Sequence, residues 1–154
     1  MKEMRRQDRA ISQEDAMIIL IQGEYGVLST VSDKNEPYGI PLNYSIRDNS
    51  IYFHSAVEGE KIEHIQNNNR VSFCVVGRTK ILPSKFSTGY ESVIVFGEIE
   101  EVYDDEKQKA LEDIVHKYSP DFEEKGKSYI EASSFETRVF KITIEHLSGK
   151  ARKF

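Results

Sequence analysis

Residues 51–73, IYFHSAVEGEKIEHIQNNNRVSF, contain two β-strand patterns separated by a short helix pattern. The strand patterns, Ser50–Ser55 and Arg70–Gly77, are rich in the β-branched and aromatic residues that strands favour. Between them, Gly59–Asn68 carries two isoleucines at a spacing that places both on one side of a helix. We therefore expect strand, short helix and strand, with the isoleucines of the helix turned inward.

The residues before this stretch predict a pair of antiparallel strands. Tyr25–Val31 is rich in strand formers and stops at the polar cluster Ser32–Glu36, which is typical of a turn. Tyr38–Ile46 then alternates apolar with small or polar residues, so that one face is apolar. Asp48 and Asn49 predict a two-residue hairpin turn into the next strand.

The residues after the stretch add two further strands. Arg78–Gly89 has the composition of a loop, and Tyr90–Tyr103 is the longest strand pattern, with Gly97 as a plausible bulge. Arg138–His146 alternates apolar and polar residues and predicts the last strand. Because hairpins rather than regular strand–helix–strand units link the strands, a doubly wound parallel sheet is disfavoured. We expect a mainly β (α+β) fold, a small antiparallel barrel of about six strands with peripheral helices.

Two segments predict peripheral helices. Ser12–Asp15 is similar to a capping box and opens a helix that ends at Gly23. Asp104–Tyr118 has an apolar stripe at helical spacing and is closed by Pro120. Phe122–Ser134 is polar and shows no clear pattern.

Length, composition and charge limit the class of protein. A chain of 154 residues and 17.8 kDa predicts one domain over residues 1–154, with residues 1–10 as a charged N-terminal arm. The net charge of −5 argues against binding nucleic acid through the whole surface. The longest apolar run near the N-terminus, Met17–Ile21, is far shorter than a membrane span. We therefore expect a cytoplasmic protein with no nucleic-acid or membrane partner.

Sequence motifs of catalysis and metal binding are missing. The chain has no GxGxxG, GxxxxGK[ST], HExxH or GxSxG motif, so no catalytic residue is predicted. No metal is expected, because the histidines are too widely spaced for a local site: His54, His64, His116 and His146. We expect His64 and His116 to be exposed on helices. The single cysteine, Cys74, lies within a strand and is expected to be a small buried core residue.

The strand Pro41–Tyr44 is a candidate for contact with a flat ligand. Opposite its apolar side it offers Asn43 and backbone groups, and an amide can donate to and accept from the polar edge of a heterocycle. Taken alone, the pattern is better explained by an edge strand in which Pro41 blocks pairing.

The junction after the next strand is a candidate for binding a phosphate. Lys61 lies in the predicted first turn of a helix, where free N–H groups and the helix dipole favour an anion. His54 and Ser55 would add hydrogen-bond donors. The alternative is a solvated loop, because the carboxylates of Glu58 and Glu60 oppose a bound dianion.

Several segments in the same order resemble a known family. The chain is similar to the pyridoxamine 5′-phosphate oxidase-like flavin-binding split barrels, and among them to the nitroimidazole-resistance (Nim-type) subgroup. The segments that carry the resemblance are PYGIPLNY (37–44), residues 51–73 and GYESVIVFGEIEEV (89–102), and it extends from MRRQDR (4–9) through GEYGVLSTV (23–31) to HLSGKA (146–151).

The resemblance implies a six-stranded split barrel that forms a homodimer, with a flavin at each end of the subunit interface. The flavin would usually be FMN, with FAD as the alternative. The resemblance assigns the phosphate to His54, Ser55 and Lys61, the isoalloxazine ring to the strand of Pro41, Leu42, Asn43 and Tyr44, and an approach from the partner subunit to Tyr90 and Ser92. Asn43 and Lys61 are supported both by this resemblance and by residue chemistry.

The function implied by the resemblance is that of a flavin-dependent oxidoreductase. It would pass electrons from a reduced nicotinamide or another donor to a small acceptor such as a nitroaromatic. The cofactor supplies the electron chemistry, so the lack of a catalytic motif is compatible with this function. One alternative is a flavin or haem carrier without turnover, and another is a structural or interaction domain.

Overall fold

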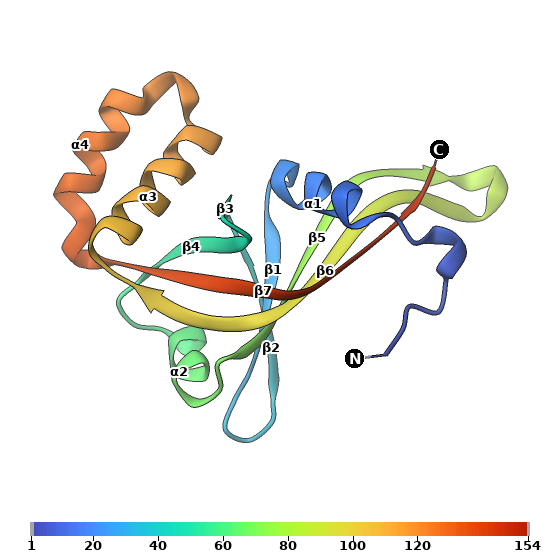
Figure 1. Ribbon diagram of the computed structural model, residues 1–154, viewed down its shortest axis with the longest axis horizontal. Coiled ribbons are helices and arrows are strands. Elements are labelled where there is room, and N and C mark those ends of the chain that lie inside the picture. The colour runs from blue at the N-terminus through green and yellow to red at the C-terminus, as the bar shows by residue number, and fades with distance from the viewer. Residues whose placement is uncertain (1, 154) are drawn as a thin grey trace.

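One antiparallel sheet of seven strands curls around the centre of the molecule (Figure 1). The computed structural model describes residues 2–153, so Met1 and Phe154, the ends of the expected domain, lie outside the described residues. The order of the strands in the sheet is β2-β1-β5-β6-β7-β4-β3. The strands are β1 (Gly26–Val31), β2 (Pro37–Leu42), β3 (Ser45–Arg47), β4 (Ser50–Ala56), β5 (Arg70–Leu82), β6 (Ser87–Val102) and β7 (Thr137–Arg152).

The connection between the two edge strands makes the sheet a barrel. β2 and β3 lie at opposite edges of the sheet, yet only Asn43 and Tyr44 separate them in the sequence. Two residues span at most about 7 Å, so the sheet must roll up to bring its edges together. Because β2 pairs with β1 and β3 pairs with β4, the wall is split at this junction.

The single strand expected over Tyr38–Ile46 is wrong, which explains seven strands instead of about six. It breaks at Tyr44, whose amide donates to the hydroxyl of Tyr118 (3.1 Å) and whose carbonyl accepts from Lys117 (3.1 Å). These side chains take the backbone groups that a continuous strand would pair. The expected turn at Asp48 and Asn49 is confirmed, since both have the positive φ angles, 49° and 59°, of a type I′ turn.

Four helices surround the barrel (Figure 1). Ser12 caps the first helix by accepting from the amide of Asp15, and the amide of Gly23 closes it on the carbonyl of Ile19, as expected. Residues 122–134, for which no structure was expected, form most of a fourth helix. The helices are α1 (Gln13–Gln22), α2 (Glu60–Asn67), α3 (Asp104–Tyr118) and α4 (Glu123–Ser133), with 3₁₀ turns η1 (Gln7–Arg9), η2 (Pro83–Lys85), η3 (Pro120–Phe122) and η4 (Ser134–Glu136). Within residues 2–153 no helix combines the length and the apolar composition needed to cross a membrane.

The core fills the barrel and continues under two of the helices. Inside the barrel, the ring of Phe53 stacks on Phe140, with centroids 5.6 Å apart, and Tyr44 meets Phe73 edge to face at 5.0 Å. A second apolar cluster joins β4, β6 and β7 to α3 and α4: Tyr52, Val102, Ala110, Leu111, Ile130 and Val139. The expected bulge is confirmed, because the register of β6 and β7 shifts at Gly97, where a Cβ would collide with a backbone carbonyl.

The longest hairpin projects from the barrel (Figure 1). The loop expected over Arg78–Gly89 is wrong, since β5 and β6 pair as far as Leu82 and Ser87. The arms of this hairpin pair with each other and bury little, so their sequence lacks the alternation that marks a half-buried strand. β7 is likewise longer than the expected Arg138–His146 and runs from Thr137 to Arg152.

Candidate functional site

The residues predicted to bind a phosphate lie where β4 leads into α2. His54 is exposed on β4, Ser55 is buried, and Lys61 is half-buried in the first turn of α2. Partial desolvation, and then the charge of Lys61, lower the pKa of His54. The hydroxyl of Ser55 donates to the carbonyl of Ala56 (3.1 Å), which engages the donor expected for a phosphate. Within residues 2–153 Lys61 forms no ion pair with a carboxylate, so its charge is available to an anion.

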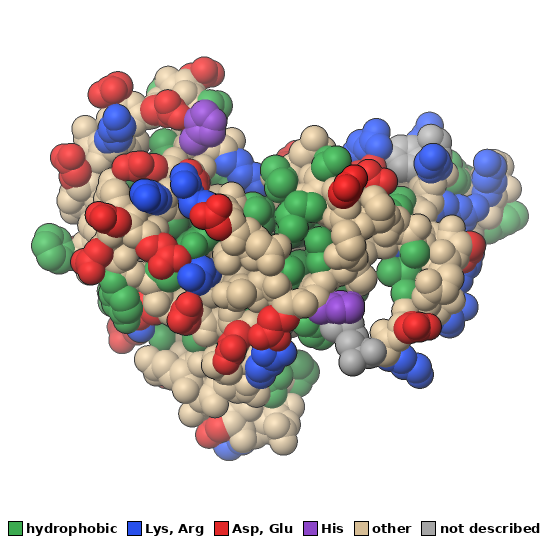
Figure 2. All heavy atoms as spheres, in the orientation of Figure 1, with side chains coloured by type: hydrophobic (Ala, Val, Ile, Leu, Met, Phe, Trp, Pro, Cys, Tyr) green, Lys and Arg blue, Asp and Glu red, His purple; other side chains and the backbone are tan. Residues whose placement is uncertain are grey.

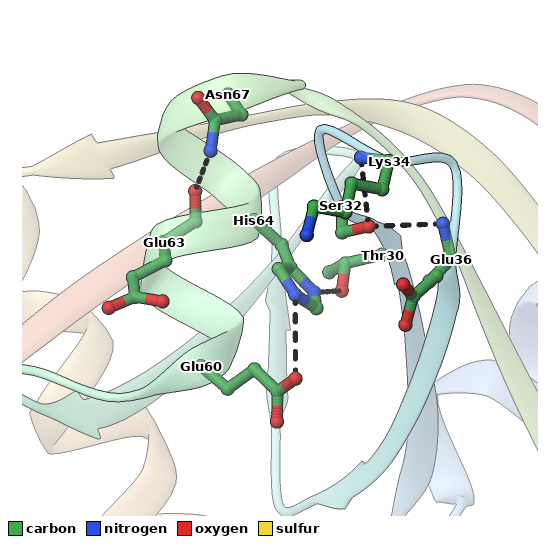
Figure 3. Close-up of polar contacts among 8 residues, drawn as sticks. All are labelled: Thr30, Ser32, Lys34, Glu36, Glu60, Glu63, His64 and Asn67. Atoms are coloured by element: carbon green, nitrogen blue, oxygen red, sulfur yellow. Dashed lines mark hydrogen bonds and ion pairs between the residues drawn. The ribbon is translucent and has the colours of Figure 1, made fainter.

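A buried histidine attaches α2 to the barrel (Figure 3). The expectation that His64 is exposed is wrong: its exposed fraction is 7%, and Nδ1 lies 2.9 Å from Oγ1 of Thr30 on β1. The carboxylate of Glu60 lies 3.7 Å from Nε2, and the ring of Tyr38 meets the imidazole edge to face at 5.3 Å. Because Lys61 is on the same short helix, this contact helps to fix its position.

The hydrogen bond between His64 and Thr30 should be measurable in the stability of the protein. Thr30→Val keeps the shape of the side chain and leaves Nδ1 of His64 buried without a partner, so the free energy of unfolding should fall by about 1–3 kcal/mol. The measurement is urea unfolding. Thr143→Val on the exposed face of β7 is the control and should change stability by no more than about 0.5 kcal/mol. Equal stabilities of the two variants would contradict the role of this bond.

Arg138 is a residue near the phosphate region that sequence reasoning missed. It pairs with Ser55 across β7 and β4, donates to the carbonyl of Val57 (3.0 Å), and forms a half-buried ion pair with Glu101 (2.6 Å). The guanidinium therefore holds the loop between β4 and α2. No sequence signal indicates this role, because it depends on the register of strands that are about eighty residues apart.

The four residues predicted beside the ring differ in what they expose. Pro41 and Asn43 are exposed, whereas Leu42 is half-buried and packs against the barrel core. Tyr44 is fully buried and donates its hydroxyl to the carbonyl of Leu20, so only its backbone remains near the surface. Burial raises the pKa of Tyr44.

The register brings the ring segment and the phosphate segment to one place. Ser45 on β3 pairs with Tyr52 on β4. Asn43 lies two residues before Ser45 and His54 lies two residues after Tyr52, so the antiparallel register sets Asn43 and His54 at the same level. That level is the split in the barrel wall, where β2 turns away toward β1.

Two side chains of α3 close the inner side of this split and were also missed. Lys117 places its amine 3.8 Å from the centre of the Tyr44 ring, and the hydroxyl of Tyr118 donates to the carbonyl of Glu24 (2.7 Å). Burial lowers the pKa of Lys117 to about 8. Their position at the end of an amphipathic helix gives no signal of these contacts.

The pKa of Lys117 predicts how stability depends on pH. In the unfolded chain the ordinary pKa is 10.5, so between about pH 8 and pH 10 the unfolded chain binds more protons than the folded protein. The free energy of unfolding should therefore rise with pH across this window. Urea unfolding at intervals of pH measures the slope, and Lys117→Gln should flatten it. An unchanged slope in the variant would contradict the assignment.

Tyr90 and Ser92 lie far from the split within one chain. His54 is level with Val102 of β6 through their shared neighbour on β7, and Tyr90 is twelve residues further along β6. At about 3.3 Å per residue the separation is roughly 40 Å. The structure therefore does not bring Tyr90 and Ser92 to His54 in one subunit, which leaves the predicted approach from a partner subunit as the remaining possibility.

Tyr90 is instead surrounded by cations near the ends of the chain. Its hydroxyl accepts from Arg9 (3.4 Å), and Lys150 lies over its ring. The hydrogen bond from Arg9, followed by the charge of Lys150, lowers the pKa of Tyr90. Arg9 belongs to the N-terminal arm, which is attached to β7 by a bridge between Ala10 and Lys150.

The remaining candidates stay outside this site. His116 is exposed on α3, as expected, and His146 is exposed on β7. Cys74 is half-buried rather than buried, because every second residue of β5 faces away from the barrel interior, and burial raises the pKa of its thiol. Among residues 2–153 no group of His, Cys, Asp and Glu side chains is placed to hold a metal ion.

Comparison with known proteins identifies relatives of the whole barrel. The model of the family described as pyridoxamine 5′-phosphate oxidase matches residues 12–151. No curated protein gives a significant match.

Solved structures share the fold over most of the chain. A proposed 5-nitroimidazole antibiotic resistance protein from Bacteroides thetaiotaomicron VPI-5482 has 25% identity and a TM-score of 0.74, covering 92% of this chain and 86% of that chain. An FAD-binding protein from Mesorhizobium loti has 28% identity and a TM-score of 0.68, covering 94% and 98%. The flavocytochrome Anf3 from Azotobacter vinelandii, at 19% identity and a TM-score of 0.79, covers 99% and 73% and shows the fold alone.

Proposed function

The chain belongs to the pyridoxamine 5′-phosphate oxidase family, and from this premise we propose that it is a flavin-dependent oxidoreductase. The flavin would be FMN, held at the split in the barrel wall. Electrons would pass from a reduced nicotinamide or another donor to a small acceptor such as a nitroaromatic. The description of the Bacteroides relative as a proposed 5-nitroimidazole resistance protein supports this class of acceptor.

The convergence of the two predicted segments carries this proposal. Asn43 and His54 lie at the same level on either side of the split, and Lys61 follows in the first turn of α2. Exposed amide and backbone groups at Asn43 suit the polar edge of a flavin ring. The available charge of Lys61 suits the phosphate at the other end of FMN. An elongated ligand with a polar ring and a phosphate fits this order of groups.

The protein's own residues would bind and orient the cofactor. Asn43 would hold the ring edge, and Lys61 with the exposed imidazole of His54 would hold the phosphate. Lys117 and Tyr118 would fix the backbone on which Asn43 is carried. The flavin, when bound, supplies the transfer of electrons.

The proposed active form is a homodimer. Tyr90 and Ser92 are too far from His54 to meet the same flavin within one chain, so only a second copy would bring them there. Ile94 and Phe96 on the outer face of β6 have exposed fractions of 41% and 38%, and they supply apolar surface for such an interface. The cytoplasmic location expected from the sequence stays a prediction.

The proposal is tested by the absorption spectrum of the purified protein and by titration with FMN. We expect a yellow protein, or an unbound form that quenches FMN fluorescence with saturation at one flavin per chain. Binding no stronger than that of an unrelated protein would refute the proposal. Parallel titration with FAD decides between the two flavins.

A carrier without turnover is the second candidate, because related barrels include proteins described as binding FAD and haem. Stopped-flow mixing of the flavin-loaded protein with NADH and with NADPH separates the candidates. Bleaching of the flavin by either donor supports the oxidoreductase. A flavin that dithionite reduces and neither nicotinamide bleaches would support the carrier.

A further inference from the structure

A groove on the side of the molecule away from α3 and α4 is lined by the N-terminal arm, α1 and the end of β7. It has a volume of about 1020 Å³, and an adjoining hollow of about 700 Å³ shares five of its lining residues. Figure 2 shows Lys and Arg side chains gathered on the right of the molecule, where these segments meet, and Asp and Glu side chains on the left. The shared residues are Ile11, Asp15, Ala151, Arg152 and Lys153.

Cations without carboxylate partners surround one end of this groove. Arg9 and Lys150 each lie 5.8 Å from the centre of the Tyr90 ring, and Arg152 pairs with Tyr90 across the sheet. All three cations are half-buried, and exposed Lys153 follows them along the chain. Within residues 2–153 none of these four forms an ion pair. In a chain of net charge −5, grouped cations of this kind repel one another, and a bound anion would relieve the repulsion.

The acidic residues of the groove do not balance this charge. Asp8 is occupied by Arg6 at 2.7 Å, and Glu91 by Arg78 at 2.6 Å. Asp15 is the carboxylate that lines both hollows without such a pair, and a further carboxylate, Glu24, lines the larger one.

The other end of the groove is apolar and exposed. Ile18, Tyr25 and Val76 line the larger hollow, with exposed fractions of 50%, 58% and 56%. A ligand suited to both ends has a flat apolar ring and a strongly anionic group.

We propose that this groove binds a phosphate-bearing aromatic anion, the chemical class to which nicotinamide nucleotides belong. The phosphate lies among Arg9, Lys150 and Arg152, and the ring lies against Tyr25 and its apolar neighbours. All of these residues come from one chain, so binding needs neither the dimer nor a flavin. The role of the ligand as electron donor rests on the proposed function.

Calorimetric titration at low ionic strength with pyrophosphate, NADP⁺ and NAD⁺ tests the inference. The protein should bind pyrophosphate, and it should bind NADP⁺ more tightly than either pyrophosphate or NAD⁺. The double variant R9Q/K150Q should weaken pyrophosphate and NADP⁺ by at least about tenfold each. Tyr25→Ser should weaken NADP⁺ and leave pyrophosphate unchanged.

The matched control is Lys127→Gln, which removes an exposed lysine from α4 and should change neither affinity. Circular dichroism checks that each variant is folded. Failure of the wild-type protein to bind pyrophosphate and NADP⁺ overturns the inference, as does wild-type affinity in R9Q/K150Q. Equal affinity for pyrophosphate and NADP⁺ overturns the aromatic part. FMN titration of the same samples reports on the proposed function separately, because either ligand can bind without the other.

Discussion

Tyr44→Ala should lower the free energy of unfolding by about 3–5 kcal/mol, the largest effect expected of a single substitution at the split. The ring is fully buried against Phe73, and its hydroxyl donates to the carbonyl of Leu20. Removing it leaves a cavity inside the barrel and an unpaired buried carbonyl. Urea unfolding followed by far-ultraviolet circular dichroism measures the change.

Two further variants separate the parts of this effect. Tyr44→Phe keeps the ring and removes only the hydroxyl, so it should cost about 1–2 kcal/mol. Asn43→Ala changes an exposed neighbour and should stay within about 0.5 kcal/mol of the wild type, while it weakens FMN. A Tyr44→Ala protein as stable as the wild type would contradict the burial of the ring.

Lys61→Ala should weaken FMN by roughly tenfold to a hundredfold, because one charge-assisted hydrogen bond contributes about 1.5–3 kcal/mol. Riboflavin, which has the same ring and no phosphate, should bind the variant as it binds the wild type. Fluorescence titration with both ligands measures the two affinities. The comparison isolates the phosphate, since any general damage to the pocket would weaken both.

Lys34→Ala is the matched control for this prediction. Lys34 is an exposed lysine in the turn between β1 and β2, close to α2 (Figure 3), and its removal should leave both affinities unchanged. Equal weakening of FMN and riboflavin by Lys61→Ala would place the phosphate elsewhere.

The sequence predicted the barrel because its strands bury one face and its turns are local. Alternation in β1, β4 and β6 and the turn at Asp48 and Asn49 depend on neighbouring residues alone. The break at Tyr44 depends on Lys117 and Tyr118, about seventy residues away, and no local pattern carries that information.

Elements that bury little apolar surface were missed for a related reason. α4 buries only Ile130 among its described residues, so its sequence has no apolar stripe. His64 was expected to be exposed because a helix position says nothing about Thr30, its partner on another strand.

The candidate site was predictable in its chemistry and only partly in its geometry. Lys61 and Asn43 could be chosen because a cation in a first helical turn and an amide on a strand have direct chemical meanings. The roles of Arg138 and Lys117 arise from the register and from packing, which bring distant residues together. Tyr44 shows the converse, since its neighbour Asn43 is exposed while its own side chain belongs to the core.

The position of β7 in the sheet has a consequence for how the protein is made. β7 is the last strand of the sequence, yet it lies between β6 and β4 and joins β2-β1-β5-β6 to β4-β3. During translation these two halves have no strand to connect them until β7 leaves the ribosome. Closure is therefore a late, long-range event, and the nascent chain exposes open sheet edges until then. Chaperone binding to stalled nascent chains should fall sharply once β7 is free to pair.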